Sequence, residues 1–398
     1  MVKGRDQMKL TVDFSPCVAL EVLIASLIAF FTAIGNSAMV SNLFAVGFII
    51  IFCYVLLNIH NWRYGQSIVL FLSLCIMNVF VNGLFENGRF DFNYLKKVIM
   101  FAAFTLFLNA AAREEIYISN TTVKLIKILP VLAGTFLVYS YSYMGNTGTI
   151  AGGITLGFSN PNFAGMWLLH FFLYGCLFVL EALNGSKIRI LLIPILIQIW
   201  KMIILTRARS CFIGIAAFFL LLILGVWNKR TNKFVLFCIA ITPFVFAIIY
   251  LNIAYSAWFQ QTFSFAISTG KSLTSRVGIW RYALERFWEH PITGNYSGIS
   301  FGTGWFQMHN THIDVLCSYG ILAAILFVKN LYQNMIAVND RTDSLYQYAA
   351  FCAFCAVIIT GTFEAAIVSG ATGLNLLTVA FLVLAKYRSD FESYSDII

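Results

Sequence analysis

Two residue types, arginine and histidine, carry the chemistry that this sequence indicates. Arg207 and Arg209 lie two positions apart, Arg276 lies in a later polar stretch, and His309 and His312 follow it. A guanidinium group binds phosphate through two hydrogen bonds and keeps its charge, whereas a histidine titrates near neutral pH and accepts a proton. The arginines suit a departing diphosphate, and a histidine suits the activation or orientation of an attacking hydroxyl.

Each of these residues also has a purely structural interpretation. Arg207 and Arg209 could snorkel from a helix end to lipid headgroups, but together with Lys201 they favour an anion site. His309 could be a helix-cap or interfacial histidine, and His312, three residues later on nearly the same helical face, competes for its role. The sequence has no D-x-D motif and no Cys/His set with zinc spacing, so we expect no metal and no cofactor.

The elements that position these residues must lie in a membrane. Hydrophobic residues make up 60% of the 398 positions and charged residues only 11%, against roughly 25% charged in soluble domains. This composition excludes a cytosolic enzyme, a disordered protein and a collagen-like fibre. The net charge of +9 does not indicate nucleic acid, because the basic residues occupy short gaps between apolar runs. Among the nine cysteines, Cys352 and Cys355 form a C-x-x-C inside an apolar helix, which favours packing over a redox pair.

We therefore predict an all-α, polytopic transmembrane helix bundle that forms one domain over residues 1–398. A spanning helix needs about 20 mainly apolar residues. With the N-terminus in the cytoplasm, most of the 26 basic residues fall inside, whereas Lys201, Arg207, Arg209 and Arg276 belong to the outer face. About 12 spans are predicted, over residues 17–34, 38–58, 67–84, 95–112, 124–144, 162–183, 188–205, 211–227, 233–252, 311–329, 346–367 and 370–387.

Two outer segments are distinctive. Residues 253–310 form the only long loop, and within it Val277, Trp280 and Phe287 follow helical spacing up to Pro291. This pattern predicts an amphipathic helix on the outer membrane surface or on the bundle. Residues 145–161 are rich in glycine and either bring backbone close to a ligand or act as a plain connector.

Several short motifs resemble the O-antigen ligase/polymerase superfamily, and together they cover residues 155–325. The similar pattern is an R-x-x-x-W helix, a P-x-x-G turn, an H-N pair and a downstream G-I. The matching segments are Ser275–Trp280, Glu289–Gly294, His309–His312 and Ser318–Ile321, with Ser159–Asn162 and Thr206–Arg209 upstream. In the last of these, Ala208 replaces the serine that is usual in the family.

This resemblance implies a metal-independent membrane glycosyltransferase that uses undecaprenyl-diphosphate-linked glycans. It implies that Arg209 and Arg276 bind the diphosphate and that His309 acts near the acceptor hydroxyl as base or orienter. The Ala208 departure leaves open whether Arg207 or Arg209 is the family arginine; we favour Arg209, because a small residue and an apolar helix follow it. The expected substrate-binding residues are Arg207, Asn310, Trp280, Asn160 and His312.

The resulting hypothesis is a polymerase of lipid-linked repeat units for O-antigen, capsule or exopolysaccharide. It would act in the cytoplasmic (inner) membrane of a bacterium, with its active site facing the periplasm or outside. The expected partners are the lipid-linked glycan, the bilayer, a flippase and a chain-length regulator, with no nucleic acid. The alternative is a ligase of the same superfamily, which would transfer the glycan to lipid A core or to a protein.

Two further alternatives come from other functional classes. A lipid or sugar transporter finds its best support in the intramembrane residues Glu21 and Glu364. However, a carboxylate at a helix end or in a packed polar pair explains them as well, and the chain shows no repeated halves. A non-enzymatic scaffold protein would not need Arg209 or Arg276 at all.

Overall fold

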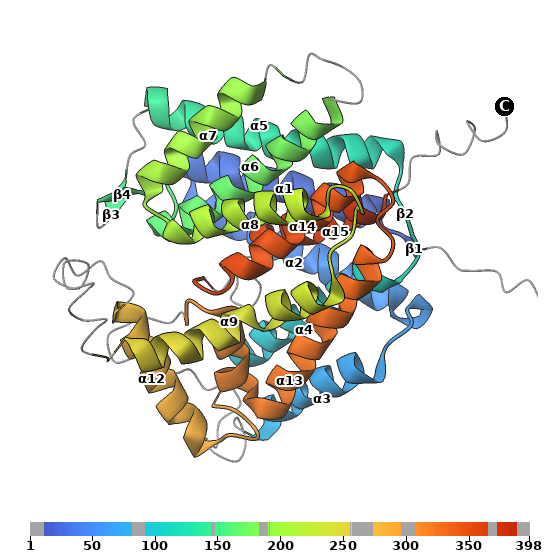
Figure 1. Cartoon of the computed structure of the whole chain (residues 1–398), viewed down its shortest axis with the longest axis vertical. Helices are drawn as coiled ribbons and strands as arrows, with labels where there is room; N and C mark the ends of the chain where they lie inside the picture. The colour runs from blue at the N-terminus through green and yellow to red at the C-terminus, as the bar shows by residue number, and fades with distance from the viewer. Residues whose placement is uncertain are drawn as a thin grey trace, which may run out of the picture.

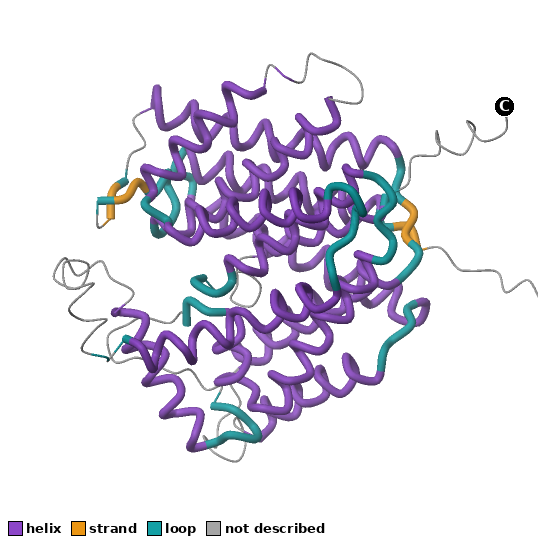
Figure 2. Tube along the Cα trace, viewed as in Figure 1, coloured by secondary structure: helices purple, strands orange, loops and turns teal. Residues whose placement is uncertain are grey.

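The chain folds into a bundle of helices in this computed structural model (Figure 1). The structure describes residues 12–81, 92–144, 148–150, 152–182, 190, 192–254, 256, 274–295, 308–364 and 372–387. Figure 2 shows that helix dominates these residues and that the short strands lie at the periphery. The predicted all-α, membrane-type bundle is confirmed.

The helices are joined mostly by short connections. They are α1 (Ser15–Ala33), α2 (Ser37–Asn58), α3 (Gln66–Phe80), α4 (Phe92–Arg113), α5 (Asn120–Met144), α6 (Pro161–Ala182), α7 (Ile193–Thr206), α8 (Arg209–Gly225), α9 (Lys233–Ile253), α12 (Thr274–Glu289), α13 (Thr311–Asn339), α14 (Leu345–Thr360) and α15 (Thr372–Lys386). A 3₁₀ turn, η1 (Ile59–Asn61), follows α2. Strand β1 (Val12–Asp13) pairs in parallel with β2 (Ile116–Tyr117), and β3 (Thr149–Ile150) pairs antiparallel with β4 (Gly153–Ile154).

Twelve of the described helices are apolar, and each of the predicted ranges overlaps one of them. By length and composition, α1, α2, α5, α6, α9 and α13 can cross a membrane. The apolar helices α3, α7, α8, α14 and α15, and the stretch Val98–Arg113 of α4, are shorter. The predicted ends were wrong for α13, which continues past residue 329 to Asn339, and for α14, which ends at Thr360 before residue 367. The added turns of α13 are polar and bind neighbouring elements, which an apolar-length criterion overlooks: Asn334 accepts from Arg113, and Asn339 accepts from Thr231.

The described connections between helices lie at the two ends of the bundle and follow the alternation expected for a series of membrane-spanning helices (Figure 1). The first and last described residues, Val12 and Tyr387, lie at one end, which we call the terminal end. There Lys386 Nζ donates to Ala111 O and joins the ends of α15 and α4. The opposite end, which we call the site end, carries the α7–α8 turn and residues 290–295, 308–310 and 361–364.

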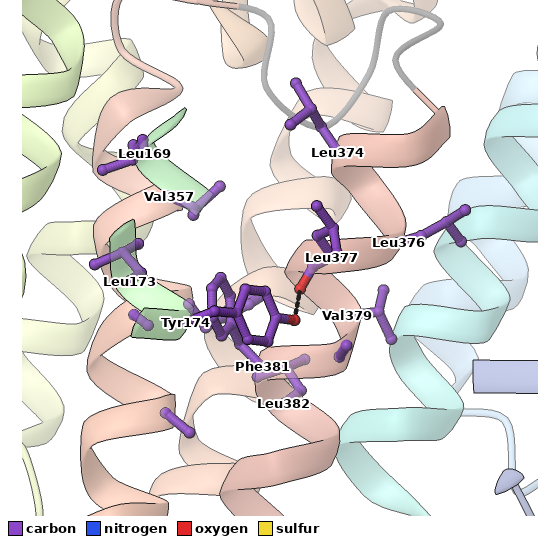
Figure 3. Packing of buried hydrophobic residues seen from close by; sticks show 14 of the residues in the cluster. Leu169, Leu173, Tyr174, Val357, Leu374, Leu376, Leu377, Val379, Phe381 and Leu382 are labelled. Atoms are coloured by element: carbon purple, nitrogen blue, oxygen red, sulfur yellow. Dashed lines mark hydrogen bonds between the residues drawn. The ribbon is translucent and has the colours of Figure 1, made fainter. Parts of the chain in front are cut away.

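The core is built around α14 and α15. Residues 347–358 of α14 and 374–385 of α15 are buried without interruption, as expected for helices that are apolar on all sides. Tyr174 of α6 packs against α15, where its hydroxyl donates to Leu377 O at 2.7 Å and its ring stacks on Phe381 at 4.3 Å (Figure 3). Helix α14 packs along α8 and α15, which holds in position the four residues that follow it at the site end.

The two intramembrane carboxylates have different environments. Glu21 is buried in the interior of α1, and neither of its carboxyl oxygens has a hydrogen-bond partner among the described residues. It therefore matches neither the helix-end nor the packed-pair interpretation. Glu364 lies beyond the end of α14 and does form a packed polar group.

Candidate active site

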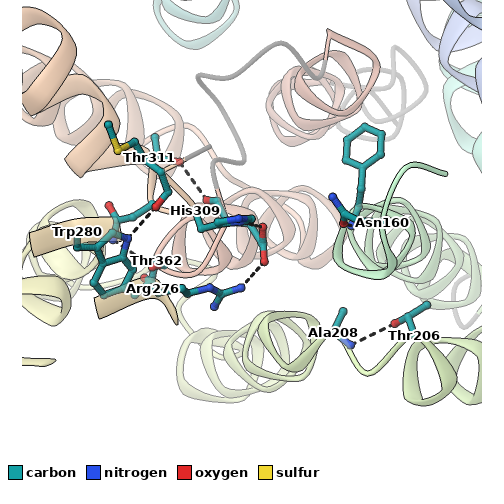
Figure 4. A network of polar contacts seen from close by, with 12 residues as sticks. Asn160, Thr206, Ala208, Arg276, Trp280, His309, Thr311 and Thr362 are labelled. Atoms are coloured by element: carbon teal, nitrogen blue, oxygen red, sulfur yellow. Dashed lines mark hydrogen bonds and ion pairs between the residues drawn. The ribbon is translucent and has the colours of Figure 1, made fainter. Parts of the chain in front are cut away.

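A buried network of three charged or titratable side chains lies at the site end. Arg276 Nη2 donates to Glu364 Oε1 at 2.6 Å, and His309 Nδ1 lies 3.0 Å from Glu364 Oε2 (Figure 4). The side chains are only 16%, 10% and 12% exposed for Arg276, Glu364 and His309. Since a carboxylate only accepts hydrogen bonds, this contact places the proton of a neutral imidazole on Nδ1 and leaves Nε2 as the acceptor.

Helix α12 positions Arg276 and also fixes the backbone beside His309. Arg276 and Trp280 are four residues apart, so they project from the same face of the helix. Trp280 is fully buried, and its indole Nε1 donates to Met308 O at 2.7 Å. The R-x-x-x-W spacing therefore has a physical purpose: one helix face holds the arginine at Glu364 and the tryptophan at the residue before His309.

His309 itself has a backbone conformation that is rare outside glycine. Its φ is 49°, in the left-handed region, where a residue with a side chain is strained and persists only when its surroundings enforce it. Hydrogen bonds of the two neighbouring residues hold this conformation: Met308 O accepts from Trp280, and the Asn310 side chain donates to Pro243 O.

The side chain of Asn310 forms several of the hydrogen bonds that hold this segment in place. Its Oδ1 accepts from the amides of His312 and Ile313 at 3.0 Å and caps α13. Its Nδ2 donates to Pro243 O at 2.8 Å and to Thr362 O at 3.0 Å. One buried amide side chain thus joins α13 to α9 and to the turn that carries Glu364.

The next two residues extend the same set of contacts. The Thr311 amide donates to Gly361 O at 3.0 Å. His312 is buried, and its Nε2 donates to Ala240 O of α9 at 2.7 Å. Pro243 lies inside α9 three residues after Ala240, and its missing amide hydrogen leaves the carbonyl of the preceding turn, that of Ile239, without its helical donor. Within His309–His312, it is the His309 ring that contacts the Glu364 carboxylate.

The P-x-x-G turn and the downstream G-I interlock. Gly320 breaks α13, with φ 85° and ψ 175°. Ile321 N donates to Pro291 O at 2.9 Å, and Asn295 N donates to Cys317 O at 2.7 Å. Residues 291–295 therefore replace the internal hydrogen bonds that α13 loses at its break. We call this contact the turn–helix splice; it ties the end of α12 to the middle of α13.

The side chains of Arg207 and Arg209 lie in different surroundings. Arg207 ends α7 with φ 58°. Its guanidinium lies against the backbone of Gly152, where an added Cβ would be only 2.7 Å from Nη1. The described part of the glycine-rich segment therefore packs closely on the arginine-bearing turn and is not a plain connector.

Arg209 is the first residue of α8 and is exposed, without an ion-pair partner among the described residues. A Cβ added at Gly214 would lie 2.4 Å from Thr360 Oγ1, so α8 packs closely on the last turn of α14.

The structure thus brings Arg276 and His309 together on Glu364. Helix α8, which begins at Arg209, packs on the last turn of α14, and no contact between Arg209 and the network is seen among the described residues. Asn310, His312 and Trp280 are buried; the Asn310 amide, the Trp280 indole and His312 Nε2 bind protein groups, whereas His312 Nδ1 has no hydrogen-bond partner among the described residues. Asn160 caps α6 by accepting from Phe163 N at 2.7 Å, and Figure 4 shows its side chain on the far side of His309 from Arg276. Their expected contacts with substrate remain predictions.

Glu364 is the residue that sequence reasoning did not assign to the site. The available signal was its place: a single carboxylate directly after an apolar helix, at the same predicted end as Arg276 and His309. Among the described residues, no group of three or more His, Cys, Asp or Glu side chains is arranged to hold a metal ion.

The comparison with protein families agrees with this geometry. The family described as O-antigen ligase matches residues 194–328, from α7 into α13. That range contains α8, α12 and the His309–His312 segment. No curated protein and no solved structure matches the chain.

The helix bundle is of the multi-pass membrane type, and the match over residues 194–328 indicates similarity to a family of enzymes that transfer glycosyl groups. More particularly, the resemblance to the O-antigen ligase/polymerase superfamily is confirmed.

Proposed function

We propose that this protein polymerises undecaprenyl-diphosphate-linked oligosaccharide repeat units at the outer face of a bacterial cytoplasmic membrane. The observation that carries the proposal is the Arg276–Glu364–His309 network, of which Arg276 and His309 lie in the region matched by the O-antigen ligase family. It combines a fixed cation for a leaving diphosphate with an oriented imidazole for an attacking hydroxyl, which are the two functions that glycosyl transfer from such a donor needs.

In the proposed reaction, the acceptor hydroxyl attacks the anomeric carbon of the lipid-linked glycan. The new glycosidic C–O bond forms as the bond to the diphosphate oxygen breaks, and the hydroxyl proton passes to His309 Nε2. Undecaprenyl diphosphate leaves with the bonding electrons, and Arg276 and Arg209 neutralise its charge. Neither a metal ion nor a nucleotide sugar takes part.

Glu364 acts as a positioning residue in this scheme. Its two oxygens bind Arg276 and His309 separately, so one carboxylate sets the distance between the leaving-group site and the base. It also stabilises the imidazolium that forms when Nε2 takes the proton. Arg276 uses only Nη2 for this contact, which leaves its Nε and Nη1 donors for phosphate oxygens.

The proposed membrane orientation places the terminal end in the cytoplasm and the site end outside. Described basic residues gather toward the terminal end, as the positive-inside rule requires; these are Arg63, Arg113, Lys124, Lys127, Lys229, Arg230, Lys233, Lys329, Arg341 and Lys386. The product would serve as O-antigen, capsule or exopolysaccharide. A flippase would supply the donor, and a chain-length regulator would act on the product.

The second candidate is a ligase that passes the same glycan to lipid A core or to a protein, and the description of the matching family favours it. Donor binding and base chemistry would be identical in both cases, so the acceptor alone separates them. The test is therefore purified protein in lipid nanodiscs, supplied with one lipid-linked repeat unit and no other acceptor. A ladder of products supports the polymerase, whereas product only after addition of lipid A core or protein supports the ligase.

Variants show whether the network does the chemistry. His309→Ala and Arg276→Ala should each reduce product formation by about 10² or more. Arg276→Lys should recover little, because the two-pronged contact with phosphate is lost. Arg281→Ala is the matched control: Arg281 lies on the same helix, is exposed and pairs with Glu285 at 3.0 Å, so activity should stay at the wild-type level. Full activity of His309→Ala, or uptake of substrate that survives this change, would exclude the proposed chemistry and favour transport.

A further inference from the structure

The loop between α8 and α9, residues 226–232, carries a tryptophan at the end of an exposed apolar stripe. Exposed apolar residues at helical spacing lead along α8 toward this loop; they are Leu220, Ile223 and Leu224. The Lys229 amide donates to Gly225 O at 2.7 Å, so one more helical turn follows α8 and Trp227 continues the stripe. In a membrane bundle such a stripe contacts lipid chains, and Trp227, which is 90% exposed, therefore lies where the hydrocarbon ends.

Three cationic residues follow this tryptophan within six positions: Lys229, Arg230 and Lys233. Lys233 lies 3.5 Å from Asp340 in an exposed ion pair, which contributes little. Neither Lys229 nor Arg230 forms an ion pair with any described residue, and Arg230 is exposed. The surface thus passes from apolar to aromatic to cationic, which is the order of acyl chains, interface and phosphate groups in a bilayer with anionic lipid.

Contacts with the end of α13 and the turn after it hold the loop in place. Asn339 pairs with both backbone groups of Thr231: its Oδ1 accepts from Thr231 N at 2.8 Å, and its Nδ2 donates to Thr231 O at 3.1 Å. Thr342 Oγ1 donates to Lys229 O at 2.6 Å. Lys229 has a φ of 52°, a conformation that is strained for a residue with a side chain and that these contacts maintain. The loop is therefore a fixed surface, and a ligand does not have to order its backbone.

We propose that the loop between α8 and α9 binds the headgroup of an anionic phospholipid. Lys229 and Arg230 neutralise the phosphate, and the Trp227 indole lies between the headgroup and the acyl chains. A free phosphate ion would use the cations but would gain nothing from the indole and the apolar stripe beside them, so a lipid fits the whole surface better. Such binding requires neither glycosyl transfer nor a particular orientation of the protein in the membrane, so it is independent of the proposed function.

Quenching of Trp227 fluorescence measures which lipids surround the loop. The full-length protein is placed in phosphatidylcholine nanodiscs with an increasing fraction of phosphatidylglycerol whose acyl chains are brominated. Subtracting the signal of Trp227→Phe isolates this indole from the other tryptophans. We expect brominated phosphatidylglycerol to quench at a lower fraction than brominated phosphatidylcholine. Lys229→Gln combined with Arg230→Gln should raise the half-quenching fraction of phosphatidylglycerol on the order of tenfold, since each cation near an anionic surface contributes a factor of about five.

Arg63→Gln combined with Lys124→Gln is the matched control, because both residues are exposed cations at the same end of the bundle and the net charge changes equally. This pair should leave the half-quenching fraction unaltered, and the melting temperature of each variant shows whether it folds. Equal quenching by the two brominated lipids in wild type, an unchanged fraction in the loop variant, or equal shifts in both double variants would each overturn the inference. Absence of quenching by either lipid would also overturn it, because the loop would then lie in water and face another partner.

Discussion

At the scale of single residues, the sequence indicated the chemistry and the structure supplied the contacts. Arg276 and His309 were predictable because few residue types bind phosphate or transfer a proton near neutral pH. Glu364 was not, because it lies 55 residues from His309 and 88 from Arg276. Only the folded structure shows which of the few carboxylates contacts Arg276 and His309. The role of Arg209 at the diphosphate stays a prediction.

Replacing Glu364 tests its positioning role. Glu364→Gln keeps the size but removes the charge that holds the imidazolium and Arg276, so we expect kcat to fall about 10²-fold with a smaller change in KM. Glu364→Asp keeps the charge and should recover part of kcat. Steady-state kinetics with a lipid-linked donor would measure both. The melting temperature of each variant separates lost chemistry from lost folding. A kcat that stays near wild type in Glu364→Gln would contradict the role.

At the scale of elements, helical periodicity correctly predicted α12 and its end before Pro291. The same periodicity predicted one unbroken helix from residue 311, and the structure shows instead that α13 breaks at Gly320. Helical periodicity does not show the break, because apolar residues continue on both sides of Gly320. The replacement hydrogen bonds come from residues 291–295. The consequence of the break is that α12, which carries Arg276, is fixed to the helix that begins after His309.

Gly320→Ala should disrupt the turn–helix splice. The φ of Gly320 is +85°, and an added Cβ would lie 2.0 Å from Ile292 O, so the turn and α13 must separate. We expect a loss of about 1–3 kcal/mol in stability or more, together with lower activity.

Gly278→Ala on α12 is the matched control. Among the described residues, no atom outside its own helix backbone lies within 4 Å of its added Cβ, so the usual helix preference for alanine should stabilise the protein by about 0.5–1 kcal/mol. Thermal denaturation of both variants checks these opposite signs. Equal stability of Gly320→Ala and wild type would show that the splice contributes nothing.

At the scale of the whole molecule, composition and the length of apolar runs predicted nearly all helices, because lipid exposure constrains them directly. The predicted helix ends were wrong where polar contacts between helices determine the length of a helix, as at the end of α13. The alternation of the connections between the two ends follows from the same helix order. Which end faces the cytoplasm depends on the distribution of basic residues and is part of the proposed function.

Labelling with a membrane-impermeant maleimide tests that orientation. Ile292 at the site end and Trp227 at the terminal end are 65% and 90% exposed, so a cysteine at either position is accessible. In intact spheroplasts Ile292→Cys should react and Trp227→Cys should react only after permeabilisation. The wild-type protein, with its own nine cysteines, gives the background. The reverse pattern would place the site end in the cytoplasm and refute the proposed location of the reaction.

The anchors of the His309–His312 segment are mostly main-chain atoms of the neighbouring elements: Pro243 O, Ala240 O, Gly361 O and Thr362 O. A carbonyl group is present whatever side chain its residue carries. The side chains of α9 and of the turn after α14 near these carbonyls can therefore change without removing the contacts that hold the segment. We expect glycan preference to be open to re-engineering on these helices while the reaction centre stays in place.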